Sequence, residues 1–145
     1  MKQLVYVSQA VDKIEQSTIN AILTTAKNHN SAQGITGMLL FNGTYFLQLL
    51  EGPDGDVDTL LERIHKDPRH KNIKLLCEIE TTEFGRICHN WNMLYKHSNE
   101  ISQNTFLGKK MAEWGGADGG DKIFQHRDQI IELLKEAVKT LKVYD

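Results

Sequence analysis

The sequence contains only two cysteines, Cys77 and Cys88, and only two prolines. Two cysteines are too few for the disulfide scaffold of a small secreted protein and lack the paired spacing of a zinc site, so we expect both to be reduced thiols. No apolar run approaches the length that a bilayer-spanning helix needs, and the first residues contain no apolar signal segment. These absences favour a cytoplasmic protein without a membrane partner.

The sequence also has no large excess of charge. Its 17 Lys and Arg residues against 19 Asp and Glu residues give a formal net charge of −2. A chain with this balance has no general attraction for phosphate backbones or anionic lipids, so we do not expect it to bind nucleic acid directly. The length of 145 residues, with 40% apolar residues, fits one globular unit.

Common catalytic motifs are missing as well. There is no P-loop, G-x-S-x-G, H-E-x-x-H or G-x-G-x-x-G sequence, and the six histidines do not fall at metal-ligand spacings. A small acylphosphatase-like hydrolase would need an arginine-lined phosphate loop after its first strand, but the segment from residue 8 to 15 contains neither arginine nor glycine. We therefore expect no enzymatic activity and no metal.

The pattern of apolar residues predicts a strand and a helix at the start of the chain. Residues 4–8 are β-branched and aromatic, which is typical of a strand buried on both faces. A helix is expected to follow, with Ser17 as its N-cap and its end near residues 28–30. Its apolar positions recur at helical spacing and are Ile19, Ile22, Leu23 and Ala26.

Asn42-Gly43 separates two apolar runs, residues 35–41 and 44–50, and predicts a hairpin with a two-residue loop. The expected pairs, all on one face of the sheet, are Phe41 with Thr44, Leu39 with Phe46 and Gly37 with Gln48. Gln48 would then be a buried amide that needs partners for both its donor and its acceptor.

The rest of the chain predicts a second helix and two further strands. The helix ends before Asp67-Pro68, and its apolar face consists of Val57, Leu60, Leu61 and Ile64. The next strand has alternating apolar residues at Ile73, Leu75, Cys77 and Ile79. The last strand alternates in the same way at Trp91, Met93 and Tyr95. The order is that of an α+β, ferredoxin-like βαββαββ sandwich, with two helices on one face of a largely antiparallel sheet.

The C-terminal part is expected to be helical. We predict a short helix over residues 103–112, a glycine-rich loop over 114–121 and a long amphipathic helix over 123–144. Since the second face of the sheet needs a cover, we expect this tail to supply it. The apolar stripe of the long helix is also compatible with a contact to a second copy or to another protein.

Six short segments stand out when they are taken together: Leu4-Val5-Tyr6-Val7-Ser8, His29-Asn30, Gly34-Ile35-Thr36-Gly37-Met38-Leu39, Phe46-Leu47-Gln48-Leu49-Leu50-Glu51-Gly52, Asp67-Pro68-Arg69-His70 and Trp91-Asn92-Met93. In this order and at this spacing they resemble the BLUF family of blue-light sensors that hold FAD. The resemblance implies a flavin-binding domain over residues 1–97. Residues 98–145 resemble the helical extension of short BLUF proteins without an effector domain.

The resemblance also implies roles for individual residues. Tyr6, Gln48, Met93 and Trp91 correspond to the photoactive group beside the flavin ring. The implied cofactor-binding residues are Tyr6, Gln48, Asn30, Ile22, His29, Arg63, Asp67 and His70. Within this set, Asn30 matches the residue that binds the carbonyl edge of the ring, and Arg63 and Asp67 match contacts on its pyrimidine side.

The resemblance implies a photocycle instead of catalytic turnover. An electron and then a proton leave Tyr6, Gln48 rearranges, and the C-terminal helices pass the signal to a separate protein whose identity the sequence does not give. Two alternatives are a flavin-free interaction module with the same fold, which includes formation of a homo-oligomer, and a small hydrolase. A yellow protein with a reversible red shift under blue light would exclude both.

Overall fold

The structure is a computed structural model of the 145-residue chain. It describes residues 1–11, 14–80, 85–88, 94–97, 106–115 and 127–140, and for residues 94–97, 106–108, 127 and 137–140 it describes the backbone alone. Trp91 and Met93, which the sequence places in the photoactive group, lie outside the described residues.

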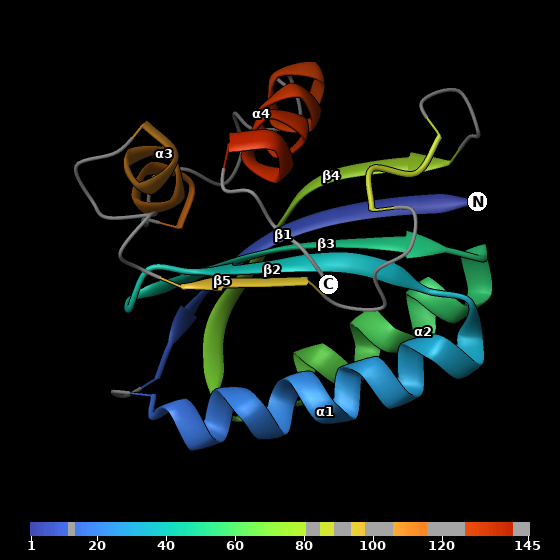
Figure 1. The fold of residues 1–145 in the computed structure, drawn as a ribbon, viewed down its shortest axis with the longest axis horizontal. Coiled ribbons are helices and arrows are strands. Elements are labelled where there is room, and N and C mark those ends of the chain that lie inside the picture. Colours follow the sequence, from blue (N-terminus) through green and yellow to red (C-terminus); the bar gives the residue numbers. More distant parts are fainter. Residues whose placement is uncertain (12–13, 81–84, 89–93, 98–105, 116–126, 141–145) are drawn as a thin grey trace.

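Within the described residues, five strands form one sheet in the order β4-β1-β3-β2-β5. Along the chain the elements are β1 (Lys2–Ala10), α1 (Gln16–Gln33), β2 (Thr36–Phe41), β3 (Tyr45–Gly52), α2 (Asp54–His65), β4 (His70–Glu80), β5 (Leu94–His97), α3 (Phe106–Gly115) and α4 (Arg127–Thr140). Among these five strands, β2 and β5 pair in parallel, and the other neighbouring pairs are antiparallel. Helices α1 and α2 cover one face, and α3 and α4 lie over the other (Figure 1). This arrangement confirms the predicted ferredoxin-like fold.

The sheet separates two apolar cores, because side chains alternate between the faces along each strand. On the side of α1 and α2 the buried residues are Leu4, Tyr6, Ile19, Ile35, Leu39, Phe41, Phe46, Leu50 and Val57. On the other side, strand residues such as Val5, Leu40 and Leu49 pack in one cluster with Met111 and Trp114 of α3 and with Ile130, Ile131 and Leu134 of α4. The tail helices therefore cover the second face, as predicted.

The hairpin between β2 and β3 differs from the prediction by two residues in register. Phe41 pairs with Phe46, Leu39 with Gln48 and Gly37 with Leu50. The reason is the side chain of Asn42, whose Oδ1 accepts hydrogen bonds from the main-chain N–H groups of Thr44 (3.0 Å) and Tyr45 (2.8 Å). A shift of two keeps every side chain on its predicted face, so Gln48 still faces α1 and α2, but opposite a leucine and not a glycine.

Helix α1 begins one residue before the predicted cap and ends later than predicted. Glu15, not Ser17, is the N-cap residue, and the helix continues through residues 28–30 to Gln33. It ends where Gly34 adopts φ +69°, a conformation that glycine reaches at no steric cost. Asn30 therefore lies inside the helix, with its side chain buried.

The alternating sequence of β4 predicts that its apolar residues all lie on one face. In the structure they do not. Tyr6 pairs with Leu75 but Val5 pairs with Cys77, so Leu76 is an extra residue in the ladder. Before this β-bulge, Ile73 and Leu75 pack on the side of α1 and α2. After it, Cys77 and Ile79 pack on the side of α3 and α4, together with Leu76 itself.

Helix α3 ends later than predicted, whereas α4 lies within the range predicted for its helix. Helix α3 extends to Gly115, so Trp114 is a buried helical residue and not the start of a loop. Helix α4 covers the middle of the predicted 123–144 helix, and Ile130 and Leu134 of the predicted stripe are buried. Leu141 and Tyr144 lie outside the described residues. Of the predicted last strand, the structure describes β5 alone.

The close approach of α3 to Tyr45 gives a first testable prediction. A Cβ atom at Gly115 would lie 2.5 Å from Cδ1 and 2.6 Å from Cε1 of Tyr45. We expect Gly115→Ala to lower the free energy of unfolding by about 1–3 kcal/mol, because the ring or the helix must move. Urea denaturation measures this change.

Gly55→Ala is the matched control for this prediction. Gly55 lies in α2, and a Cβ atom there would meet no heavy atom within 4 Å. Since alanine favours helix, this variant should be unchanged in stability or more stable by up to about 1 kcal/mol. Equal stability of Gly115→Ala and the wild-type protein would contradict the seating of α3 on Tyr45.

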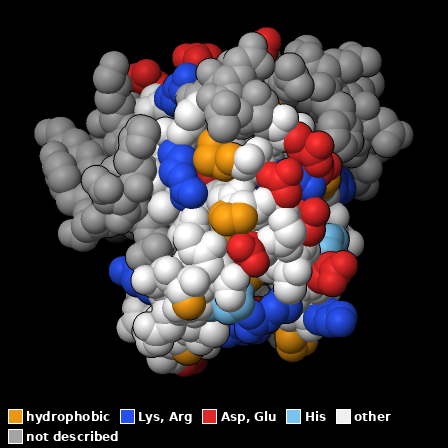
Figure 2. Space-filling view, turned by 90° about the vertical axis from the view of Figure 1, so that its right-hand side faces the viewer, with side chains coloured by type: hydrophobic (Ala, Val, Ile, Leu, Met, Phe, Trp, Pro, Cys, Tyr) orange, Lys and Arg blue, Asp and Glu red, His pale blue; other side chains and the backbone are white. Residues whose placement is uncertain are grey.

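Lys2 joins β1 to α2 and β4 at the end of the molecule that carries the N-terminus. Its Nζ lies 2.8 Å from carboxylate oxygens of Asp58 and Glu78 and 3.2 Å from Glu80. The hydrogen bonds to Asp58 and then Glu78 raise the pKa of Lys2 above its ordinary value. Figure 2 shows acidic side chains gathered on this end.

No helix in the described part of the chain is long and apolar enough to span a membrane.

Candidate functional site

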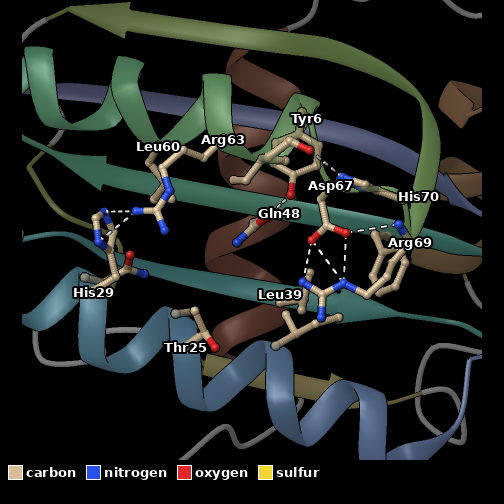
Figure 3. A pocket seen from close by; sticks show the side chains of 15 residues that line it. Tyr6, Thr25, His29, Leu39, Gln48, Leu60, Arg63, Asp67, Arg69 and His70 are labelled. Atoms are coloured by element: carbon tan, nitrogen blue, oxygen red, sulfur yellow. Dashed lines mark hydrogen bonds and ion pairs between the residues drawn. The ribbon is translucent and has the colours of Figure 1, made fainter.

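A pocket lies between α1 and α2, with the sheet as its floor (Figure 3). The strands β1, β2 and β3 and the helices α1 and α2 contribute to it, as do the residues after α2. The lining residues are Tyr6, Ile22, Thr25, Ala26, His29, Asn30, Leu39, Phe46, Gln48, Leu60, Arg63, Ile64, Asp67, Arg69 and His70.

Tyr6 and Gln48 meet on the floor of this pocket. They are directly paired across β1 and β3, which places both side chains on the same face of the sheet. The phenol O–H of Tyr6 donates a hydrogen bond to Oε1 of Gln48. Because the Tyr6 hydroxyl donates to the oxygen of the amide, the NH₂ group of Gln48 is directed away from Tyr6.

Tyr6 keeps its proton at any ordinary pH. The residue is 2% exposed, and burial in the apolar floor raises the pKa of its phenol above the ordinary value of 10.0. The negative charge of Asp67 raises this pKa further. A neutral phenol is the form that can donate its O–H to Gln48.

The two helices supply the walls of the pocket. On α1, Ile22, Ala26 and Asn30 recur every four residues and so lie on one face, with His29 beside them. On α2, Leu60 and Ile64 are also four residues apart. The walls are therefore mainly aliphatic, with amide groups from Asn30 and Gln48 near the sheet.

Arg63 and His29 connect the two helices at the edge of the pocket. Arg63 Nη1 lies 2.9 Å from Nδ1 and 3.1 Å from Nε2 of His29 (Figure 3). Arginine has donors only, so the histidine must accept from it through a ring nitrogen that carries no proton. This contact joins α1 and α2 across the opening between them.

Asp67 and Arg69 form an ion pair after the end of α2. Arg69 Nε lies 2.8 Å from Oδ1 of Asp67, and the main-chain N–H of Arg69 donates to the same oxygen at 3.0 Å. The side-chain hydrogen bond from Arg69 is the main cause that lowers the pKa of Asp67 below its ordinary value of 3.8. A carboxylate and a guanidinium thus line one end of the pocket.

This ion pair predicts an effect of pH on stability. A carboxyl whose pKa is lowered on folding stabilises the protein above its unfolded pKa, and this contribution is lost as the pH falls. We expect Arg69→Gln to raise the pKa of Asp67 towards 3.8 and so to reduce the loss of stability between about pH 6 and about pH 3. Urea denaturation at these pH values, with a carbon NMR titration of Asp67, measures both effects.

Arg63→Gln serves as the control, because Arg63 lines the same pocket but donates to His29. The acid sensitivity of this variant should match that of the wild-type protein. An unchanged Asp67 titration in Arg69→Gln would mean that Arg69 does not set the pKa of this carboxyl.

His70 is fixed between β1 and the end of α2. Its Nε2 lies 2.8 Å from the carbonyl oxygen of Ile64, and its Nδ1 lies 2.8 Å from Oγ of Ser8. A carbonyl only accepts, so Nε2 carries a proton, and in the neutral ring Nδ1 accepts from the Ser8 hydroxyl. The ring makes an edge contact with Tyr6, at 6.2 Å between centroids. Ser8 and Ile64 thus orient His70 beside Tyr6.

All eight residues that the sequence assigns to cofactor binding line this one pocket. Whether they bind a cofactor stays a prediction, and Trp91 and Met93 cannot be placed because they lie outside the described residues. Seven lining residues were not among the predicted site residues: Thr25, Ala26, Leu39, Phe46, Leu60, Ile64 and Arg69. Helical spacing from Ile22 would have found Ala26, and the Asp67-Pro68-Arg69-His70 segment contains Arg69.

The lining suits a flat aromatic ligand with a polar rim. Such a ring needs apolar walls above and below it and hydrogen-bonding groups at its edge, and the pocket offers both. Within the residues that the structure describes, no three His, Cys, Asp or Glu side chains are grouped as metal ligands.

Comparison with known proteins agrees with this description. Residues 1–94 match the family model "BLUF: Sensors of blue-light using FAD". The blue light- and temperature-regulated antirepressor BluF of Escherichia coli (strain K12) is 42% identical over 76 residues, which are 52% of this chain and 19% of that protein. Photoactivated adenylate cyclase subunit beta of Euglena gracilis is 43% identical over 70 residues, 48% of this chain and 8% of that protein.

A solved structure extends the similarity towards the C-terminal part. The ground state of BlsA superposes with a TM-score of 0.68 at 29% identity, over 92% of this chain and 87% of that chain. This chain thus spans less than a fifth of the two curated relatives but most of a solved structure. The family match covers the whole pocket, from Tyr6 to His70. This chain belongs to the BLUF family, the sensors of blue light that use FAD.

Proposed function

We propose that this chain is a photoreceptor in which Tyr6 and Gln48 form a light-driven hydrogen-bond switch beside FAD. The observation that carries the proposal is the hydrogen bond from the Tyr6 hydroxyl to Gln48 Oε1 on the floor of the pocket. FAD, when bound, supplies the absorption of blue light and an excited ring that accepts an electron. The aliphatic walls would hold the ring, and Asn30 and Gln48 would meet its polar edge.

The switch needs the properties that burial gives to these two side chains. Tyr6 can lose an electron, and its acidity then rises so far that the proton moves along the existing hydrogen bond to Gln48 Oε1. When the electron returns, the amide gives one proton back to the Tyr6 oxygen, which leaves both side chains neutral and Gln48 with its donor and acceptor ends exchanged. Since one such rearrangement changes the free energy by about 1 kcal/mol, the lit arrangement should revert in the dark.

His29, Arg63, Asp67 and His70 position the same ligand from the pocket's edge. The Arg63–His29 contact joins α1 and α2 at the edge of the pocket, and the Asp67–Arg69 ion pair keeps a carboxylate at the opposite end. His70 is held by Ser8 and Ile64 and packs against Tyr6. These residues bind and orient, and the proposal assigns no substrate turnover to the chain.

The output is proposed to pass through the opposite face of the sheet to a separate protein. Residues 98–145 form the extension in this proposal, and α3 and α4 pack on the face that lies behind Tyr6 and Gln48. Couplings between two sites are typically about 1–3 kcal/mol, enough to change how such helices dock. Relatives named an antirepressor and an adenylate cyclase subunit support an effector outside this chain.

An absorption spectrum before and after blue illumination tests the proposal directly. Protein produced with ample riboflavin should be yellow, and blue light should cause a small red shift that reverses in the dark. Colourless protein would favour a flavin-free interaction module with this fold. Coloured protein whose spectrum does not respond to light would refute the switch.

A further inference from the structure

Glu51 is a fully buried carboxylate on the face of the sheet opposite the pocket. Its Oε2 accepts hydrogen bonds from Gln3 Nε2 and from the main-chain N–H of Ile87, both at 2.7 Å. Its Oε1 accepts from the main-chain N–H of Cys88 at 2.8 Å, with the Thr36 hydroxyl at 3.5 Å. The pocket does not use this group.

Two of these donors belong to the segment of residues 85–88, which other contacts also tie to the sheet. Gln3 Nε2 donates to the carbonyl oxygen of Gly85 at 2.8 Å. The guanidinium of Arg86 donates to Thr36 Oγ1 at 2.9 Å and to the carbonyl oxygen of Gly34 at 3.0 Å. Each of the four residues is therefore fixed to β1, β2, β3 or the end of α1, and Glu51 holds two of them.

Glu51 and Gln48 lie three residues apart on the same strand and face opposite sides of it. Gln48 lines the pocket, whereas Glu51 pairs with Gln3 of β1 and Thr36 of β2 on the other face. Along the chain, the held segment comes directly before Trp91 and Met93, and then β5, which pairs with β2. Strand β3 thus carries both the switch residue and the attachment of the segment that leads to β5.

The geometry points to Glu51 as a positioning residue of the light response, which attaches residues 85–88 to β3 and sets how fast the lit state reverts. This inference rests on the proposed photoreceptor function. The Glu51 carboxylate accepts four hydrogen bonds, and two of them, from the main-chain N–H groups of Ile87 and Cys88, attach the segment. A rearrangement of Gln48 strains β3 against the fixed segment, and release of this strain drives the return to the dark state. Weakening the attachment therefore prolongs the lit state.

Glu51→Gln tests this role with little change in volume. Whichever carboxylate oxygen becomes NH₂ will face a main-chain N–H of Ile87 or Cys88, so one buried donor loses its acceptor. We expect the dark flavin spectrum and the size of the red shift to match the wild-type protein. Hydrogen exchange at the Ile87 and Cys88 amides should accelerate about tenfold, and dark recovery should slow at least about threefold.

Arg86→Met is the second variant, for the case that Glu51→Gln does not fold. It leaves the Glu51 carboxylate intact and removes the hydrogen bonds that the Arg86 side chain makes to Thr36 and Gly34. It should slow dark recovery in the same direction. Glu80→Gln is the matched control, because this exposed glutamate contacts Lys2 and not residues 85–88, and its recovery should equal that of the wild-type protein.

The outcomes separate this inference from the proposed function. A wild-type red shift with unchanged recovery in both Glu51→Gln and Arg86→Met would overturn the role of Glu51 and leave the switch standing. Loss of the red shift in Glu51→Gln, with flavin still bound, would also overturn it, because Glu51 would then act on the photochemistry itself. A wild-type protein without any red shift would instead refute the proposed function.

Discussion

Tyr6→Phe should give a yellow protein that no longer shows a red shift under blue light. The phenylalanine ring keeps the packing of the floor but lacks the O–H that donates to Gln48 Oε1, so neither the proton nor its hydrogen bond is available. Flavin binding should persist, because the walls on α1 and α2 are unchanged. The light-minus-dark absorption difference is the measurement, and we expect it to fall to the noise level.

Two further variants make this prediction specific. Gln48→Ala should also abolish the normal photoproduct, because the acceptor of the Tyr6 proton is removed. Tyr45→Phe is the matched control, since Tyr45 lies on β3 but packs against the core on the other face. It should show the full red shift. Normal photocycles in both Tyr6→Phe and Gln48→Ala would refute the roles assigned to this pair.

Leu134→Asp should separate the photochemistry from the output. Leu134 of α4 is 1% exposed and packs in the core between the sheet and the tail helices. A carboxylate at this position would either be buried without water, at a high cost in free energy, or force α4 to leave the sheet. We expect the free energy of unfolding to fall by about 2–5 kcal/mol. The red shift should remain, because the pocket lies on the opposite face.

The measurement for this variant is hydrogen exchange over residues 127–136 in the light and in the dark. The wild-type protein should show a difference between the two states, whereas Leu134→Asp should exchange rapidly in both. Gln129→Asp introduces the same charge at an exposed position of α4 and should behave like the wild-type protein. If illumination leaves exchange in the wild-type tail unchanged, the route through α3 and α4 is wrong.

The fold could be predicted because its strands and helices differ clearly in the period of their apolar residues. The hairpin predicted from Asn42-Gly43 determined the face of Gln48, and a register error of two residues left that face unchanged. The register itself depended on which residues of the turn are paired. The side chain of Asn42 accepts hydrogen bonds from the main-chain N–H groups of Thr44 and Tyr45. The Asn-Gly rule for two-residue loops considers only backbone angles and so does not predict these hydrogen bonds.

The pocket could be predicted only in part. The resemblance gave residues that carry polar chemistry, such as Asn30 and Arg63, and the structure brings them to one place. Arg69 was not predicted, since its position depends on the ion pair with Asp67 and on how the chain leaves α2. The contacts of Glu51 with residues 85–88 have no sequence signal either, because they are made to main-chain groups 36 and 37 residues away.

The extra residue in β4 has a consequence for comparing relatives of this chain. Leu75 and Cys77 already face opposite sides of the sheet, as adjacent strand residues do, with Leu76 inserted between them. If Leu76 were deleted, all the remaining side chains of β4 would therefore still face the same core as before. Deletion of this one residue should thus be tolerated, at the expense of one buried leucine, and alignments of related sequences should allow a gap at this point.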